Sequence, residues 1–387
     1  MEGAGTADGG AGREADPDDG PLCLKHIHDG CLAKQLRVFH ADCRFCPSRT
    51  TEAVRLADVG DAVWRATFRR SPGGRIGAVP QWGHASDVLE KSLDPARVVK
   101  EECGDVFDSR VLGAVEDWVD RRYWSDPDGF VPRGLMRDSW ANFCRTVIER
   151  DLHLPDDETS RGSDRDGLNV LMRRIAGIVQ KSGLISTCRP GDLIWRGRMR
   201  AGATPSPHYQ AADIGCAPTD RASENRMSRA GVPLFYGSGD VATAVAELAA
   251  RDERPYAAVV AFEPCRPIKM FDLVRIPEPP SLFDLENAAR REALLFLKDF
   301  AEDLSRPVLY DGSPHREYRP TQYLTDYLRQ SPLLGVEGIR FRSAHDDDGV
   351  NYALFVGAGE CVEPGTPDGI GTLRLLKGTE QIVPRGR

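Results

Sequence analysis

The feature that most restricts the fold of this chain is a short apolar run that ends in an arginine and is followed, further along, by a second apolar run. Leu193–Trp195 leads directly into Arg196, which is typical of a buried strand that carries a cation to a pocket. The turn signal Gly231–Pro233 then precedes a second expected strand, Leu234–Tyr236. We therefore expect Arg196 and Tyr236 to lie on neighbouring elements of one fold.

A helix is expected directly after the second strand. Gly237–Gly239 interrupts the strand, and Asp240 is placed to cap the N-terminus of a helix. The apolar residues that follow have helical spacing, at Val241, Ala244, Val245 and Leu248. Glu247 then lies about two turns into the helix, so the sequence predicts an arginine, a tyrosine and a glutamate on three adjacent elements.

Spacing alone leaves two interpretations of these residues open. They could form a ligand site, or Arg196 and Glu247 could form an internal ion pair while Tyr236 is part of the core. The chain has no G-x-G-x-x-G turn between a strand and a helix, so a Rossmann dinucleotide site is not indicated.

The order of these residues resembles the RES domain, a family named for its arginine, glutamate and serine. Arg196, Tyr236 and Glu247 match the family arginine, tyrosine and glutamate, and Ser343 at the end of Gly338-Ile339-Arg340-Phe341-Arg342-Ser343 matches the serine. Asn351 matches a polar position near the end of the domain. The run Pro320-Thr321-Gln322, which opens a helix in the family, is also similar.

The resemblance implies an α+β fold over residues 185–360, an ADP-ribosyltransferase-like domain with mixed or antiparallel sheets and flanking helices. It also implies action on NAD. Glu247 would stabilise the oxocarbenium-like state formed when the nicotinamide–ribose bond breaks. Arg196 would bind the pyrophosphate or the adjoining ribose, and the Tyr236 ring would stack on nicotinamide. Ser343 and Asn351 would hydrogen-bond the ribose or the nicotinamide amide.

Two classes of function follow from the resemblance. The first is an enzyme that consumes NAD by hydrolysis, by phosphorolysis or by transfer of ADP-ribose to an acceptor such as a protein. Many RES proteins are toxins paired with an antitoxin, so a cognate antitoxin is an expected partner. The alternative is an inactive RES-fold binding module that recruits a partner through the N-terminal part. The presence of the arginine, tyrosine, glutamate and serine together favours the enzyme.

Paired cysteine and histidine residues near the N-terminus predict a structural zinc site. Cys23 and His26 form a C-x2-H pair, and Cys43 and Cys46 form a C-x2-C pair sixteen residues later. Two short chelating turns at such a separation can complete a tetrahedron around zinc. Residues between the pairs could replace one ligand, namely Cys31, His28 and His40. The alternative is a set of unrelated residues in a reducing compartment.

The remaining N-terminal part is expected to be mainly helical. We expect disorder over residues 1–20, the zinc motif at 21–50 and a helical domain at 51–184 that loosely resembles the HEPN-type domain preceding RES in some proteins. Active HEPN nucleases carry arginine, four residues and histidine, and the chain has this spacing only at Arg340–His345, in the other domain. An RNase role is therefore not expected.

The segments after Glu247 predict further strands and helices. Strands are expected at 256–262, 268–273, 338–341 and 351–356, and helices at 285–304 and at 321–328 with Thr321 as its cap. The acidic triplet Asp346–Asp348 could bind a metal, but a solvated hairpin tip is the preferred interpretation. Residues 361–387 are expected to form a tail.

Charge and hydropathy exclude several classes of protein. The formal net charge of -8 does not fit a general nucleic-acid binder. No apolar run approaches the roughly 20 residues needed to span a bilayer, and the first twenty residues lack the apolar core of a signal peptide. We therefore expect a cytoplasmic protein with no membrane partner, in which the ten cysteines are not paired in disulfides.

Overall fold

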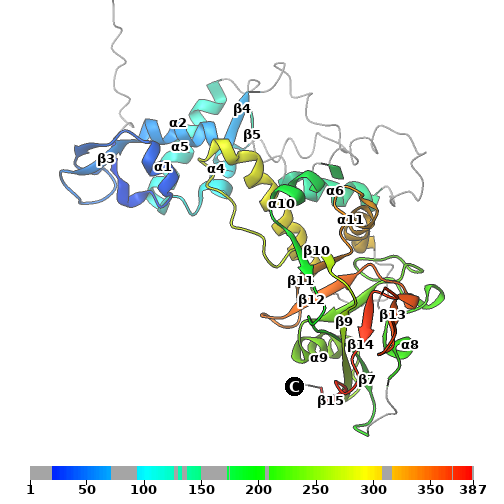
Figure 1. The fold of residues 1–387 in the computed structure, drawn as a ribbon. Coiled ribbons are helices and arrows are strands. Elements are labelled where there is room, and N and C mark those ends of the chain that lie inside the picture. The colour runs from blue at the N-terminus through cyan, green and yellow to red at the C-terminus, as the bar shows by residue number, and fades with distance from the viewer. Residues whose placement is uncertain are drawn as a thin grey trace, which may run out of the picture. The chain divides into compact units, whose positions relative to one another are not determined.

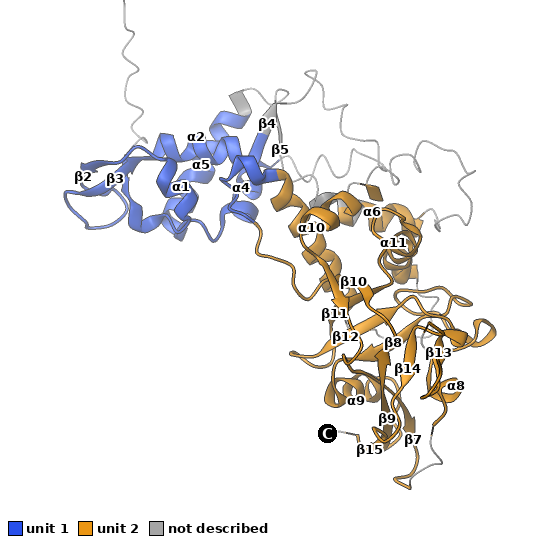
Figure 2. Ribbon diagram, in the orientation of Figure 1, with its two compact units in different colours: residues 1–79, 84–134, 280–288 blue, residues 80–83, 135–279, 289–387 orange. Residues whose placement is uncertain are grey.

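The computed structural model describes residues 20–70, 94–125, 130–132, 137–149, 172–173, 175–204, 209–306, 316–367 and 369–385. The disorder expected at the N-terminus concerns residues that, apart from Gly20, lie outside this described part. The chain divides into two compact units (Figure 2). The first contains residues 1–79, 84–134 and 280–288, and the second contains the rest.

The first unit combines a small antiparallel sheet with helices. Its three-stranded sheet has the order β1 (Pro21–Cys23), β3 (Thr51–Arg55), β2 (Phe39–Ala41). The helical elements are η1 (Leu24–His26), α1 (Gly30–Gln35), α2 (Leu56–Thr67), α4 (Pro95–Cys103) and α5 (Ser109–Ser125), and β4 (Phe68–Arg70) pairs with β5 (Phe130–Pro132). A single core of buried residues from these elements includes Leu22, Val54, Val63, Val115 and Val119.

The helical domain expected from residue 51 begins with a strand. Thr51–Arg55 forms the central strand β3, and the helix α2 starts at Leu56. Both neighbouring strands pair with β3, and β-branched residues such as Val54 suit that environment. Strand pairing therefore determines the structure at the start of the expected helical domain.

A distant segment of the chain completes the first unit. In the sequence, Pro280–Ala288 follows a strand and precedes a helix that both belong to the second unit. Its residue Phe283 is nevertheless buried in the core of the first unit. The Ser281 hydroxyl donates to Oδ2 of Asp29 at 2.8 Å, and Nε2 of Gln35 donates to the Phe283 carbonyl at 3.0 Å. The N-terminal unit is therefore not built from N-terminal sequence alone.

The second unit is organised around a ten-stranded mixed sheet (Figure 1). Its strands are β6 (Ile185–Cys188), β7 (Ile194–Arg200), β8 (Phe235–Ser238), β9 (Tyr256–Pro264), β10 (Ile268–Asp272), β11 (Gly338–Arg342), β12 (Val350–Leu354), β13 (Cys361–Val362), β14 (Leu373–Leu375) and β15 (Gln381–Pro384). The order is β13-β14-β9-β7-β8-β12-β11-β10-β6, and β15 also pairs with β9. The pairs β10–β11 and β13–β14 are parallel, and the others are antiparallel. The expected α+β class with a mixed sheet is confirmed.

Helices flank this sheet. They are α6 (Arg137–Glu149), α8 (Ala211–Ile214), α9 (Val241–Ala249), α10 (Ala288–Ser305) and α11 (Arg319–Gln330), with the short turns η3 (Thr219–Arg221), η5 (Arg316–Tyr318) and η6 (Ala358–Glu360). The turn η4 (Leu285–Asn287) lies in the segment that belongs to the first unit. The largest core joins α6, α10 and α11 through Phe143, Phe296 and Tyr323. Helix α9 covers a second core with Ala244 and Val245 against Val259. Because α6 belongs to this unit, the unit begins before the boundary predicted at residue 185.

Two local expectations are corrected. Residues 361–387 do not form a tail, since β14 and β15 both pair with β9 and so protect an edge that would otherwise lack hydrogen-bonding partners. Thr321 is not a helix cap, because α11 begins at Arg319. The Thr321 side chain is buried inside the helix and donates to the carbonyl of Arg226 at 2.5 Å.

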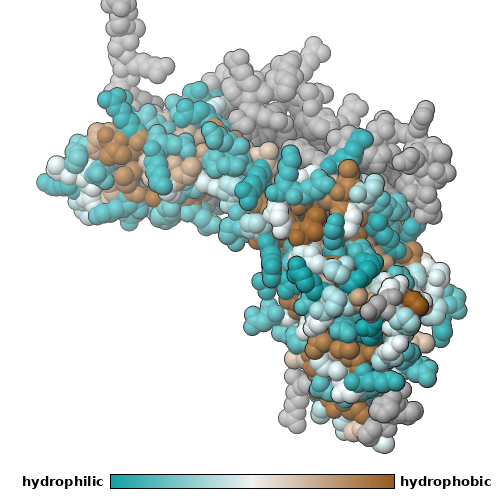
Figure 3. All heavy atoms as spheres, in the orientation of Figure 1, coloured by the Kyte–Doolittle hydropathy of each residue, from teal (hydrophilic) through white to brown (hydrophobic). Residues whose placement is uncertain are grey.

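The described helices include none that is long and apolar enough to cross a bilayer. On the face drawn in Figure 3, hydrophilic residues separate the apolar patches. The large apolar side chains that are exposed come from several distant parts of the sequence, at Val38, Phe39, Leu193, Leu285, Leu333 and Ile370.

Candidate active site and metal centre

Arg196 lies on β7, in the middle of the sheet, and is bound to main-chain oxygens. Its Nε donates to the carbonyl of Ile214 at 2.7 Å, and its Nη1 donates to the carbonyl of Tyr236. The guanidinium lies over the ring of Phe235, 4.9 Å from its centroid. Burial lowers the pKa of Arg196 from its usual value. Within the described part of the chain, Nη2 is the one guanidinium nitrogen of Arg196 without a hydrogen-bonding partner. The other two nitrogens hold main-chain segments of the site in place.

Tyr236 is fixed by a residue that the sequence did not point to. Its hydroxyl donates to Oδ1 of Asn225 at 2.5 Å, and burial raises the pKa of Tyr236 well above its usual value. The same Asn225 oxygen accepts from the main-chain N–H groups of Met227 and Ser228, each at 2.9 Å. The tyrosine hydroxyl is therefore neutral and engaged, which leaves the ring as the surface that it can offer to a ligand.

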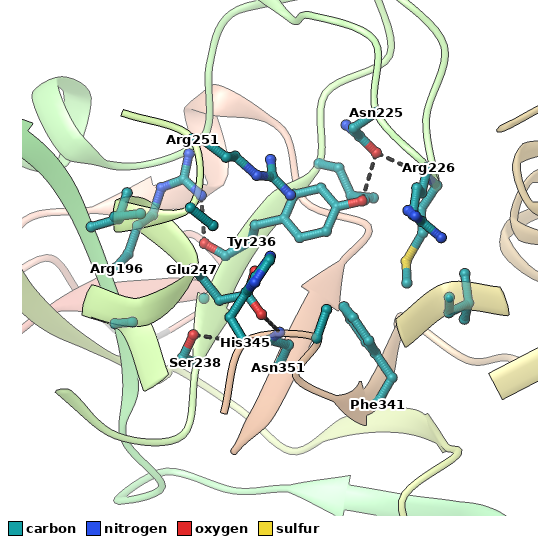
Figure 4. Close-up of a pocket in the computed structure, with 18 of the residues that line it drawn as sticks. Arg196, Asn225, Arg226, Tyr236, Ser238, Glu247, Arg251, Phe341, His345 and Asn351 are labelled. Atoms are coloured by element: carbon teal, nitrogen blue, oxygen red, sulfur yellow. Dashed lines mark hydrogen bonds between the residues drawn. The ribbon is translucent and has the colours of Figure 1, made fainter. Parts of the chain in front are cut away.

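Glu247 is held where two distant segments meet (Figure 4). Helix α9 begins as the sequence predicts, with the Asp240 side chain accepting from the N–H of Thr243 at 2.8 Å. Oε1 of Glu247 accepts from Oγ of Ser343 at 2.5 Å and from Nδ2 of Asn351 at 2.7 Å. Among the described residues, Oε2 has no partner. One carboxylate oxygen is thus oriented by the protein and the other remains available.

Ser238 extends this network and was missed by the sequence analysis. Its hydroxyl, which is buried, donates to Oδ1 of Asn351 at 2.8 Å. The N–H of His345 donates to Oγ of Ser343 at 3.1 Å. A signal for Ser238 did exist, because residues two apart on a strand share one face, and Tyr236 was already a candidate on β8.

These residues border a cavity of about 360 Å³ within the second unit. Arg196, Tyr236, Glu247 and Asn351 all line it, whereas Ser343 is not among its lining residues and acts through its hydrogen bond to Glu247. Among the described residues that line the cavity, the acidic ones are Glu224 and Glu247. They are outnumbered by arginines, namely Arg196, Arg226, Arg251 and Arg306. In a chain of net charge -8, this local excess of guanidinium groups suits an anionic ligand such as a diphosphate.

The acidic hairpin tip is only partly a solvated turn. Asp347 and Asp348 are exposed, but Oδ2 of Asp346 accepts from Oγ1 of Thr243 at 2.7 Å. Thr243 lies one helical turn before Glu247 on α9. Asp346 therefore fastens the β11–β12 hairpin, which carries Ser343, to the helix that carries Glu247.

The four predicted metal ligands lie together in the first unit. The ligand atoms of Cys23, His26, Cys43 and Cys46 are all within 4.8 Å of one another. Two sulfurs, those of Cys23 and Cys46, are 3.7 Å apart. Thiolates bound tetrahedrally at about 2.3 Å from zinc would be about 3.8 Å apart. The separation fits a shared metal ion.

Two further observations support this fit. Nε2 of His26 is buried without a hydrogen-bonding partner, while its Nδ1 pairs with Oδ2 of Asp108. A metal-binding histidine commonly has a carboxylate on its other nitrogen. The Ser48 side chain and main chain also hydrogen-bond Cys46 and lower the pKa of its thiol to about 6, which favours the thiolate form that binds metals.

Residues 198–370 match the family model described as the RES domain. The match covers the positions of Tyr236, Glu247, Ser343 and Asn351, and it begins two residues after Arg196. No curated protein and no solved structure matches the chain.

Proposed function

Because residues 198–370 of this chain form a RES domain, a family linked to NAD, we propose that the protein is an enzyme that cleaves the nicotinamide–ribose bond of NAD. The observation that carries the proposal is the state of Glu247. Its Oε1 is held by Ser343 and Asn351 while its Oε2 has no partner in the described structure, on the wall of an arginine-rich cavity.

This arrangement suits the charge that develops during the reaction. Breaking the glycosidic bond gives the ribose an oxocarbenium-like character, and a carboxylate held beside it stabilises that positive charge. Two donors on Oε1 restrict the rotation of the Glu247 carboxylate before substrate arrives. The role proposed for Ser343 therefore changes, since its hydroxyl orients Glu247 instead of contacting the ribose.

The contacts also suggest how NAD is bound. Arg196 is mostly engaged with main-chain oxygens, and Arg226 donates to the carbonyl of Asp303. Among the described cavity residues, the Arg251 guanidinium has no hydrogen bond or ion pair, which makes it the best candidate for the diphosphate. The Tyr236 ring is free to stack on nicotinamide because its hydroxyl is occupied by Asn225.

The acceptor of the cleaved ADP-ribose decides the class of the reaction. Water, inorganic phosphate and a protein side chain would give hydrolysis, phosphorolysis and ADP-ribose transfer, respectively. A role as the toxin of a toxin–antitoxin pair, with a cognate antitoxin as partner, belongs to the same proposal. The alternative of an inactive binding module is less favoured because the arginine, tyrosine, glutamate, serine and asparagine are all present and four of them border one cavity.

We also propose that the cluster in the first unit is a structural zinc site. Cys23, His26, Cys43 and Cys46 would hold the ion, and Asp108 would fix the tautomer of His26. The ion would tie the segment of β1 and η1 to the loop that carries Cys43 and Cys46. No step of NAD cleavage depends on it.

The central test measures nicotinamide released from NAD by the purified protein and by Glu247→Gln. The substitution keeps the shape of the side chain but removes its charge, so the rate should fall on the order of a hundredfold or more. Product masses with and without added phosphate or a protein extract would identify the acceptor. Wild-type protein that neither binds NAD nor releases nicotinamide under any of these conditions would leave the binding module as the better interpretation.

A further inference from the structure

Ser238 is placed to control the site without being one of its charged groups. It is the last residue of β8, it is 3% exposed, and it lies directly opposite Asn351 in the antiparallel pairing of β8 with β12. Its hydroxyl donates to Oδ1 of Asn351 at 2.8 Å. A fixed strand register thus brings a buried donor to the amide oxygen of Asn351.

The orientation of the Asn351 amide is set by Glu247, whose carboxylate only accepts, and the hydrogen bond from Ser238 then anchors the amide oxygen in place. The oxygen and the NH₂ group of an amide are similar in size but opposite in hydrogen-bonding character. With Oδ1 on Ser238, Nδ2 faces Oε1 of Glu247 at 2.7 Å. The reversed orientation would bring the amide oxygen against the carboxylate and leave two acceptors facing each other.

We propose that Ser238 is a positioning residue that acts on Glu247 through Asn351. By anchoring the amide oxygen, it holds Nδ2 of Asn351 against Oε1 of Glu247 and leaves Oε2 for the substrate. This inference rests on the proposed cleavage of NAD, and it adds a residue on which the orientation of the carboxylate depends.

The test is a kinetic double-mutant cycle on the full chain, with Ser238→Ala, Asn351→Ala and the double variant. Ser238→Ala should lower kcat on the order of tenfold and change KM for NAD by less than about twofold, since the ground-state contacts to NAD remain. In the Asn351→Ala background the same change should lower kcat by less than about twofold, because its only route to Glu247 is gone. Effects that simply multiply would overturn the proposal.

Thr325→Val is the matched control. Thr325 is fully buried, its hydroxyl donates to the carbonyl of Thr321 at 2.8 Å, and it does not line the cavity. It should lower the unfolding midpoint about as much as Ser238→Ala and leave kcat unchanged. Equal kcat values for the two variants would mean that Ser238 is only structural.

A second measurement does not need NAD. Ser238→Ala should lower the unfolding midpoint by a few degrees, and by clearly less in the Glu247→Gln background, because the introduced amide can pair with Asn351 in either orientation. Equal decreases in both backgrounds would contradict the positioning role. Failure of the wild-type protein to release nicotinamide would instead remove the proposed function alone.

Discussion

The Ser343 hydroxyl donates a hydrogen bond to Oε1 of Glu247 at 2.5 Å, across 96 positions of sequence. This contact joins the β11–β12 hairpin to helix α9, and both sides of it were candidates from the sequence. It changes what each residue is expected to do, because the serine now acts on the carboxylate and the carboxylate acts on the ligand.

Ser343→Ala should therefore reduce catalysis more than NAD binding. We expect nicotinamide release to fall between about tenfold and a hundredfold, with a loss of about 1 kcal/mol in the free energy of unfolding. Steady-state kinetics and thermal unfolding would measure the two effects. Ser305→Ala is the control, because its hydroxyl bonds the carbonyl of Arg342 nearby but does not reach Glu247. A Ser343 variant that raised KM and left kcat intact would support a direct contact with NAD instead.

Arg251→Ala should mainly affect NAD binding, whereas Arg196→Ala should mainly affect stability. Removing Arg251 should weaken NAD binding by about tenfold or more and leave the unfolding temperature nearly unchanged, because its guanidinium has no hydrogen bond or ion pair within the described structure. Removing Arg196 should destabilise the domain by about 2 kcal/mol, since carbonyl oxygens of Ile214 and Tyr236 lose their donors.

Calorimetric titration with NAD and thermal unfolding would separate these two arginines. Arg254→Ala serves as the control for charge, since Arg254 is exposed and already paired with Asp252. A stable Arg251 variant that binds NAD as tightly as wild type would show that the diphosphate contacts another side chain.

Substitutions at the three acidic residues of the hairpin tip should differ in their effects on stability and activity. Asp346→Ala should cost about 1 kcal/mol of stability and reduce activity, because it releases the hairpin from Thr243 on α9. Asp347→Ala and Asp348→Ala, at exposed positions, should change both by little. Chemical denaturation of the three variants is the measurement. A larger loss from Asp348 than from Asp346 would point to a role in binding an acceptor or a cation.

Protein purified without added zinc should contain about one equivalent of zinc. Cys46→Ser should remove most of the metal, and Asp108→Ala should weaken its binding between about tenfold and a hundredfold by releasing His26. Metal analysis and competition with a chromogenic chelator would report both. Asp105→Ala is the control, because Asp105 is an exposed aspartate of the same loop whose side chain does not bond His26. A folded first unit without metal would contradict the structural role.

Stability of the first unit should depend on that metal. A chelator should lower the unfolding temperature of the first unit, because the free energy of metal binding contributes to its folding. Nicotinamide release should persist under the same conditions, since every described residue of the cavity lies in the second unit. Equal loss of both on chelation would show that the cavity depends on the cluster.

The sequence by itself determined the local elements and the identity of the charged groups. The apolar run before Arg196 opens β7, and Asp240 caps the helix that carries Glu247. The strand expected at Leu234–Tyr236 is found as β8, but it starts at Phe235 and continues through Gly237 to Ser238, where a break was expected. These features depend on hydrophobic periodicity, turn residues and helix capping within a few residues of sequence. The spacing of the residues therefore predicts them. The two cysteine-containing pairs of metal ligands were equally predictable from the sequence, because each pair lies on one short turn.

Only the tertiary structure decided which side chains meet and what they do to one another. The pairing of Asn225 with Tyr236 and that of Ser238 with Asn351 carry no local signal, even though the strand face of Ser238 was predictable, because the partners come from separate segments joined by strand register and packing. The same holds for β15, which pairs with β9, and for Phe283, which is buried in the first unit. Long-range contacts depend on strand register and on the simultaneous packing of many side chains. Short stretches of sequence therefore show which residues are present but not which of them come into contact.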